Sequence, residues 1–383
     1  MAKQAAGTRT VRLLKPCTTA YDKLPLMLPG RLPPFLPRKG SVPLTDSTPA
    51  PGLTPVWLVL FDPLPLIQSD VPSAAFETLE IQSLVFEQYL IQDLRESATL
   101  DDYLGGADAI TDWARTLSLL PRAVVWLQLG QIEATAFSAV LQPAIFPLSQ
   151  DLSSTDPEQL LSTLKLASMV LVTVRPVADP AKVAGIMEAA DAVLSRLKNL
   201  AETVYGTSEA PMWLVTGFRG VSRQLQQPFE SGADESRMHV PLWWTDASSA
   251  GTRLQSLCGS FDLLPTLAAL LKRDHGSATA VAADPAPDGP LSLLSPQLQG
   301  TEGAARLLRI RHDAWLGLRT SQYFLLQPME TGADGADDRA DNNADASDEA
   351  AGRRLYLKPD DYWNVNDCIV SYGEIAREMA DGS

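Results

Sequence analysis

Cysteine is scarce in this 383-residue chain, which contains three, Cys17, Cys258 and Cys368. They lie far apart and form no CxxC pair, so a disulfide framework and a thiolate metal site are not expected. Apolar runs are of strand length, well short of the roughly 18 residues of a transmembrane helix. Residues 1–16 also lack the apolar core of a signal peptide. We therefore expect a protein of the reducing cytoplasm with no membrane partner.

Positive charge is also in short supply, because 31 Lys and Arg stand against 46 Asp and Glu, a net charge of −15. Such a surface repels phosphates, which argues against a nucleic-acid partner. Part of the acidity lies in residues 331–349, where Asp alternates with Gly and Ala without apolar periodicity. This segment lacks the DxDxDG register and the closing Glu of a calcium loop. We predict an exposed insertion without regular structure.

Apolar, β-rich segments alternate with helical patterns through the middle of the chain. The helical pattern is clearest at 181–203, where apolar residues recur at intervals of three and four. The strand segments are continuous apolar runs, which indicates burial on both faces. Together they predict an α/β fold with a doubly wound, mostly parallel sheet. The predicted strands cover 56–61, 123–129, 168–174, 212–216 and 239–244.

Composition divides the chain into four parts. Residues 1–54 are so rich in proline that we predict an extended or disordered segment. The α/β core then spans 55–275, and a linker rich in Pro, Gly, Ser and Ala covers 276–301. Residues 302–383 have the pattern of a small C-terminal α+β subdomain, with antiparallel strands, one helix and the acidic insertion between two strands.

Several short motifs lie in order along the chain. They are FEQY at 86–89, HVPLWW at 239–244, SFDLLPTL at 260–267, IRHDAWLGLRTSQY at 310–323, RLYLKPDD at 354–361 and NVND at 364–367. Together they resemble motifs of the sulfatases in the alkaline-phosphatase-like superfamily. Their order and spacing agree with that family from residue 56 to residue 380, although each motif is short. The resemblance implies the sulfatase fold.

The resemblance implies a nucleophile that this chain does not carry. Sulfatases use a formylglycine made from the Cys or Ser of a CxPSR or SxPSR segment, just after the motif that FEQY resembles. Here residues 90–106 contain no Cys and no Pro-Ser-Arg. Ser97 and Thr99 are the hydroxyl candidates, and a surface or helix-capping role fits both better than catalysis.

The metal positions implied by the resemblance are changed as well. Asp62 stands where the first strand delivers the leading Asp of the calcium site, but Pro63 follows it. The later loop, which carries Asp with Asn or His in the family, has Phe218 and Arg219. Calcium takes six to eight oxygen ligands, several of them anionic. We therefore expect a vestigial site without metal, cofactor or catalytic residue. In it, Asp62 and Arg219 form a salt bridge or a water-bridged contact in place of calcium.

Other conspicuous residues have simpler interpretations. Asp274-His275-Gly276 spells a metal-loop motif but follows a helix, so Gly276 fits a helix C-terminus. His239 favours a structural role at the start of a strand, and His312-Asp313 favours a turn because adjacent strand residues face opposite ways. Trp243 and Trp244 are expected to place one ring in the core and one outside.

Two functional hypotheses follow. The first is a catalytically inactive sulfatase-like protein with a binding or regulatory role, whose partners the sequence does not reveal. The alternative is an active hydrolase of sulfate or phosphate esters whose non-standard nucleophile, a Ser, Thr or Asp, lies within 92–106. That enzyme needs a cluster of His, Lys or acidic side chains at the carboxyl end of the sheet. Fold similarity alone does not decide between the two.

Overall fold

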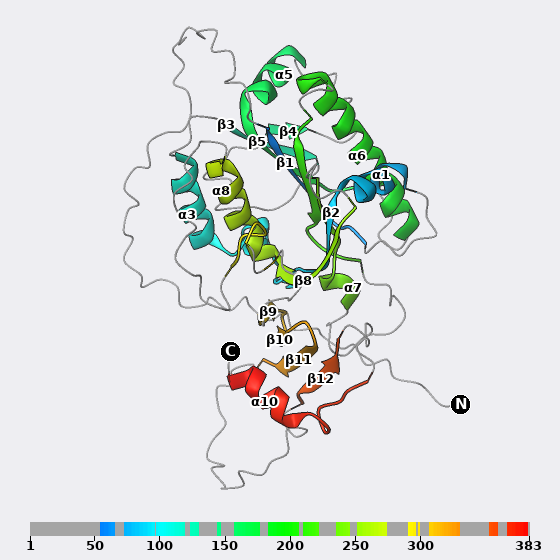
Figure 1. Cartoon of the computed structure of the whole chain (residues 1–383), viewed down its shortest axis with the longest axis vertical. Helices are drawn as coiled ribbons and strands as arrows, with labels where there is room; N and C mark the ends of the chain where they lie inside the picture. Colours follow the sequence, from blue (N-terminus) through cyan, green and yellow to red (C-terminus); the bar gives the residue numbers. More distant parts are fainter. Residues whose placement is uncertain are drawn as a thin grey trace, which may run out of the picture. The chain divides into compact units, whose positions relative to one another are not determined.

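An eight-stranded sheet organises the structure (Figure 1). Its strands are β1 (Val56–Phe61), β2 (Leu84–Leu90), β3 (Ala123–Leu129), β4 (Ala144–Phe146), β5 (Ala167–Val174), β6 (Met212–Gly217), β7 (Leu242–Trp244) and β8 (Arg253–Gly259). They lie in the order β4-β3-β5-β1-β6-β7-β2-β8. Every neighbouring pair is parallel except those that β7 makes with β6 and β2. The predicted mostly parallel α/β sheet is confirmed.

The computed structural model describes part of the chain, and the described residues belong to a compact unit spanning Pro49–Ser383. Most of the predicted segments 1–54 and 276–301, all of 331–349, and Asp274–Gly276 lie outside the described residues. In the described part, no helix is both long and apolar enough to cross a membrane. The described residues are 54–65, 73–95, 97–118, 123–129, 144–146, 157–176, 183–206, 210–221, 235–245, 251–273, 290–295, 298, 306–329, 352–358 and 366–381.

All five predicted strands lie in the large sheet. β1 and β3 begin and end where the sequence predicts, and β5 and β6 are each one residue longer. β7 is shorter, because Pro241 has no N–H to donate and His239 forms only an isolated bridge with Leu90. Three strands of this sheet, β2, β4 and β8, were not predicted; in β2 and β8 polar residues interrupt the apolar run.

Helices cover both faces of the sheet (Figure 1). In β1 the side chains of Val56, Leu58 and Leu60 enter one core, and those of Trp57 and its alternate neighbours enter the other, as the strand period requires. This double burial explains the unbroken apolar sequence of β1. The first core is covered by α3 (Ala107–Ser118) and α8 (Leu263–Arg273), and the second by α1 (Ala74–Gln82), α5 (Pro157–Leu166) and α6 (Val183–Tyr205).

The expectation for the tryptophan pair was wrong. Trp243 and Trp244 point to opposite faces of the sheet, as predicted, but both are buried, with 2% and 1% exposed. Trp243 packs in the core under α1 and α6, and Trp244 in the core under α3 and α8. The reason is that β7 lies between β6 and β2, so neither of its faces is open to solvent.

The C-terminal part forms a four-stranded antiparallel sheet with one helix, as predicted. Its strands are β9 (Leu308–Arg311), β10 (Trp315–Arg319), β11 (Tyr323–Pro328) and β12 (Arg354–Leu357), in the order β12-β11-β10-β9, and the helix is α10 (Gly373–Asp381). One face, with Leu318, Leu325 and Leu355, packs against α10. The other face, with residues such as Phe324 and Tyr356, joins the core that contains α3 and α8.

Candidate functional site

The parallel strands bring their carboxyl ends to one edge of the sheet. β2 and β6 are both antiparallel to β7, so they run in the same direction as β1 and β5. Asp62 follows β1, Arg175 follows β5, and Phe218-Arg219 follow β6. This is the edge at which open α/β sheets bind ligands. Asp62, Phe218 and Arg219 thus lie at this edge, as the sequence predicts.

Asp62 is a buried carboxylate at the end of β1, with 3% of the residue exposed. Its backbone N–H donates to the carbonyl of Val174 at 2.7 Å, which fixes it beside the end of β5. Its Oδ2 lies 3.3 Å from Nη2 of Arg175, in an ion pair. Burial raises the pKa of Asp62 above its ordinary value, although the charges of Arg219 and Arg175 both act to lower that pKa.

Arg219 is not in a direct salt bridge with Asp62, the first of the two contacts that we expected from the sequence. Among the ion pairs of the described residues, the partner of Asp62 is Arg175, while Nη2 of Arg219 donates to the carbonyl of Ala98 at 2.7 Å. The Arg219 guanidinium also lies 5.1 Å from the centre of the Phe218 ring. Its charge still reaches Asp62 and lowers the pKa of that carboxyl. The contact with Ala98 draws the Arg219 guanidinium toward the chain after β2.

Phe218 fills its position with aromatic packing. The residue is 2% exposed, and its ring centre lies 5.1 Å from that of Tyr103. The Tyr103 hydroxyl donates to the carbonyl of Gly217 at 3.0 Å and lies 2.8 Å from the hydroxyl of Tyr89. Burial raises the pKa of Tyr103 and of Tyr89, so both remain neutral phenols. Two buried hydroxyls and two rings packed at a tilt thus hold the loop after β6 in place.

The segment after β2 uses its hydroxyl residues as the sequence indicates. Thr99 is the N-cap of α2 (Leu100–Tyr103), and its Oγ1 accepts from the backbone N–H of Asp102 at 3.4 Å. Asp102 Oδ2 in turn accepts from the Thr99 N–H at 2.9 Å and from its hydroxyl at 2.8 Å. This capping box confirms the predicted role of Thr99. Ser97 is an exposed residue, as the surface interpretation requires.

The carboxylates near α2 are engaged with an arginine. Arg95 donates to both carboxylate oxygens of Asp93 and, through Nη2, to Oδ1 of Asp102 at 2.8 Å. Burial acts to raise the pKa of Asp102, but hydrogen bonds from Thr99 and the charge of Arg95 prevail and lower it. A general acid at neutral pH requires a raised carboxyl pKa. Asp102 therefore behaves as a structural anion.

The histidine interpretations are confirmed. His239 makes an isolated bridge with Leu90, and its Nε2 contacts the backbone carbonyl of Glu87, a structural role beside β2. His312 lies in the turn between β9 and β10, where its Nδ1 accepts from the N–H of Ala314 at 3.3 Å.

The residues at this edge do not fit the calcium ion of a sulfatase. Asp62 supplies one carboxylate, already paired with a cation, and Phe218 supplies no oxygen ligand. Two guanidinium groups nearby repel a divalent ion, which requires six to eight oxygen ligands. Among the described residues, no three His, Cys, Asp or Glu side chains gather closely enough to hold a metal.

This chain is similar to known proteins in its fold but not in its sequence. No protein-family model and no curated protein matches the chain. A protein of the alkaline phosphatase superfamily from Vibrio parahaemolyticus superposes with a TM-score of 0.57 at 11% identity, covering 86% of this chain and 85% of the other. The chain has the fold of the sulfatases and alkaline phosphatases.

Two further structures agree with this sulfatase-like fold. The phosphonate monoester hydrolase of Agrobacterium radiobacter gives a TM-score of 0.55 at 10% identity, with 86% of this chain and 94% of that one covered. A putative sulfatase from Bacteroides thetaiotaomicron gives 0.54 at 10% identity, with 86% and 90% covered. At such identities the likeness concerns the fold, and chemistry depends on the residues present.

Sequence reasoning missed Arg175. A signal was available, because Arg175 directly follows a predicted strand, as Asp62 does. Its importance depends on β1 and β5 being neighbours, with Phe61 opposite Val174, and strand order cannot be read from a list of strands. The sequence therefore identified Arg219, whose charge acts on Asp62, but missed Arg175, which forms the direct ion pair.

Proposed function

We propose that this sulfatase-like protein does not hydrolyse sulfate or phosphate esters and instead acts as a binding or regulatory protein. The observation that carries the proposal is the composition of the carboxyl edge, where Phe218 and Arg219 stand in the loop after β6 and Arg175 neutralises Asp62. We interpret Asp62, Phe218 and Arg219 as a vestigial metal site. Ester hydrolysis on this fold depends on cationic stabilisation of the transferring group, and a metal usually supplies it.

The absence of a suitable nucleophile in the segment after β2 supports the proposal. Thr99 holds α2 in a capping box, and Ser97 is exposed at the surface. The Thr99 hydroxyl donates to Asp102, but the lowered pKa of that carboxylate makes it a weak base. A hydroxyl without an activating base or metal is a weak nucleophile. A cytoplasmic location is part of the proposal, and the buried free thiol of Cys258 agrees with a reducing compartment.

The test is a hydrolysis assay with the purified full chain. Nitrophenyl esters of sulfate, phosphate and phenylphosphonate are offered with and without added Ca²⁺, Mg²⁺, Mn²⁺ and Zn²⁺. Asp62→Ala and Thr99→Ala, purified identically, are the matched controls for contaminating activity. We expect wild type and both variants to give the same rate. Turnover by wild type that either variant lacks would establish the rival hydrolase and identify the residue on which it depends.

A further inference from the structure

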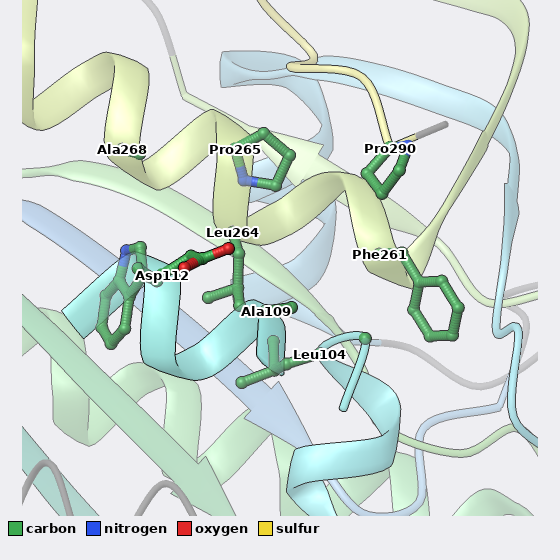
Figure 2. Close-up of a pocket in the computed structure, with 10 residues that line it drawn as sticks. Leu104, Ala109, Asp112, Phe261, Leu264, Pro265, Ala268 and Pro290 are labelled. Atoms are coloured by element: carbon green, nitrogen blue, oxygen red, sulfur yellow. The ribbon is translucent and has the colours of Figure 1, made fainter. Parts of the chain in front are cut away.

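A pocket of about 290 Å³ lies between α3 and α8, on the face of the sheet covered by these helices (Figure 2). Figure 2 shows Ala109 and Asp112 of α3 on one side and Leu264, Pro265 and Ala268 of α8 on the other. Phe261 and Pro290 close one end. This pocket has no part in the vestigial site.

The floor of the pocket is apolar and its walls are made by small residues. Leu104, Trp113 and Leu264 are buried, with 1%, 3% and 4% exposed. The adjacent Gly105 has φ +103°, and a Cβ there would come within 3.3 Å of Ala109 and 3.7 Å of the Phe261 ring. A side chain at position 105 would therefore be strained and would reach into the pocket. The glycine keeps this space open.

The size of the pocket indicates the size of the ligand. A closed apolar cavity of about 150 Å³ holds benzene. At nearly twice that volume, this pocket has room for two fused rings. Its aromatic, proline and leucine surfaces offer the flat apolar contacts that such rings prefer.

The charge at the pocket indicates the ligand's polar end. Among the described residues that line the pocket, Asp112 is the charged one. Asp112 pairs with Arg115 at 2.6 Å, but both side chains are largely exposed, 72% and 76%. Exposed pairs at this helix spacing are worth little, so a ligand cation competes readily for the carboxylate. The chain's net charge of −15 favours cationic ligands further.

We propose that the pocket between α3 and α8 binds a planar bicyclic aromatic group that carries an amine, with the rings between Ala109 and Ala268 and the ammonium at Asp112. The geometry places this site next to α2, since Leu104 and Gly105 directly follow Tyr103, whose ring contacts Phe218. The binding proposal is independent of whether ester hydrolysis has been lost. The proposal assigns a ligand class that the sequence alone does not indicate.

The probes are tryptamine and indole-3-acetate, which share one ring system and carry opposite charges. Ligand-observed NMR titrations of the full chain measure both dissociation constants. We expect saturable binding of tryptamine, about fivefold tighter than that of indole-3-acetate, the scale of one exposed charge contact. Asp112→Asn is expected to remove this preference. Glu188→Gln, an equal charge change on exposed α6 across the sheet, is the matched control and should preserve it.

Two pocket-filling variants test the location. Ala268→Phe and Ala109→Phe place a ring in the pocket from opposite helices, and each is checked for an intact melting transition before titration. We expect tryptamine binding to fall at least tenfold in every folded variant. The proposal is overturned if wild type shows no saturable binding, if both probes bind equally well, or if binding survives in a folded, filled variant. None of these results bears on the hydrolysis assay.

Discussion

The Asp62 carboxylate and the Arg175 guanidinium lie 3.3 Å apart at the carboxyl edge of the sheet. They meet because β1 and β5 are parallel neighbours with Phe61 opposite Val174, so the next residue of each strand stands beside the other. The carboxylate is buried while the Arg175 side chain is 53% exposed. A buried anion thus has a partly solvated partner, and burial is the largest influence on the pKa of the carboxylate.

Asp62→Asn is expected to stabilise the protein at pH 7. Because burial raises the pKa of Asp62, the folded state holds the proton more tightly than the unfolded state does. The ionised carboxylate therefore costs stability above the folded pKa, and this cost disappears below the ordinary Asp value of about 3.9. Thermal melting at pH 7 should show an increase on the order of 1–3 °C that vanishes towards pH 4. A lower melting temperature for Asp62→Asn at pH 7 would show that the charge stabilises the fold.

Arg306→Met is expected to cost about 3–5 kcal/mol of unfolding free energy. The side chains of Arg306 and Asp262 are 2% and 0% exposed, and two hydrogen bonds of 2.6 Å join them. Removing the arginine leaves a buried carboxylate without its cation. Urea denaturation at pH 7 measures the loss, with the exposed Arg115→Gln as the control, which should cost less than about 1 kcal/mol. Equal losses in the two variants would refute this account.

Asp191→Ala is expected to destabilise the protein by about 1 kcal/mol, because Asp191 caps the start of the neighbouring helix α1. Asp191 lies in α6, and its Oδ1 accepts from the N–H groups of Ala75 and Phe76, at 2.9 and 3.2 Å, in the first turn of α1. It thus serves as the cap that Ser73 does not provide. Hydrogen exchange should show faster exchange at the start of α1 in Asp191→Ala. Unchanged protection there would contradict the capping role.

Tyr103→Phe is expected to cost about 1–3 kcal/mol, because it leaves the buried Tyr89 hydroxyl and the Gly217 carbonyl without this partner. Tyr89→Phe should cost less, since the bond from Tyr103 to Gly217 remains. Urea denaturation of the two single variants and the double variant gives their coupling energy. A coupling energy near zero would mean that the two hydroxyls do not act as one network.

Much of the fold could be predicted because its central strands are buried on both faces. A strand such as β1 must then be apolar at every position, and that run is visible in the sequence. β8 is an edge strand, and its first residues, beginning with Arg253, are exposed or only partly buried. Its apolar pattern is therefore weaker than that of β1. The burial of both Trp243 and Trp244 was missed for a related reason. It depends on β7 lying between β6 and β2, and the order of strands in a sheet is not visible in the sequence.

The sequence predicts the edge of the sheet at which the candidate site lies, but it does not predict the side-chain contacts within that site. Asp62 and Arg219 were identified because they follow strands, and parallel strands end together. Which arginine meets Asp62 depends on side-chain directions, and Arg219 turns instead to the carbonyl of Ala98. The pocket between α3 and α8 had no signal in the sequence, because its lining comes from small and apolar residues in separate parts of the chain.

Calorimetric titration of the purified, chelator-treated full chain with calcium tests the central claim most directly. The claim is that the carboxyl edge holds an arginine-paired carboxylate where a metal site has been lost. We predict no binding heat and no rise in melting temperature at millimolar calcium, since an ion that binds only the folded state would raise it. Stoichiometric calcium binding that Asp62→Ala abolishes would contradict the account and restore the hydrolase hypothesis.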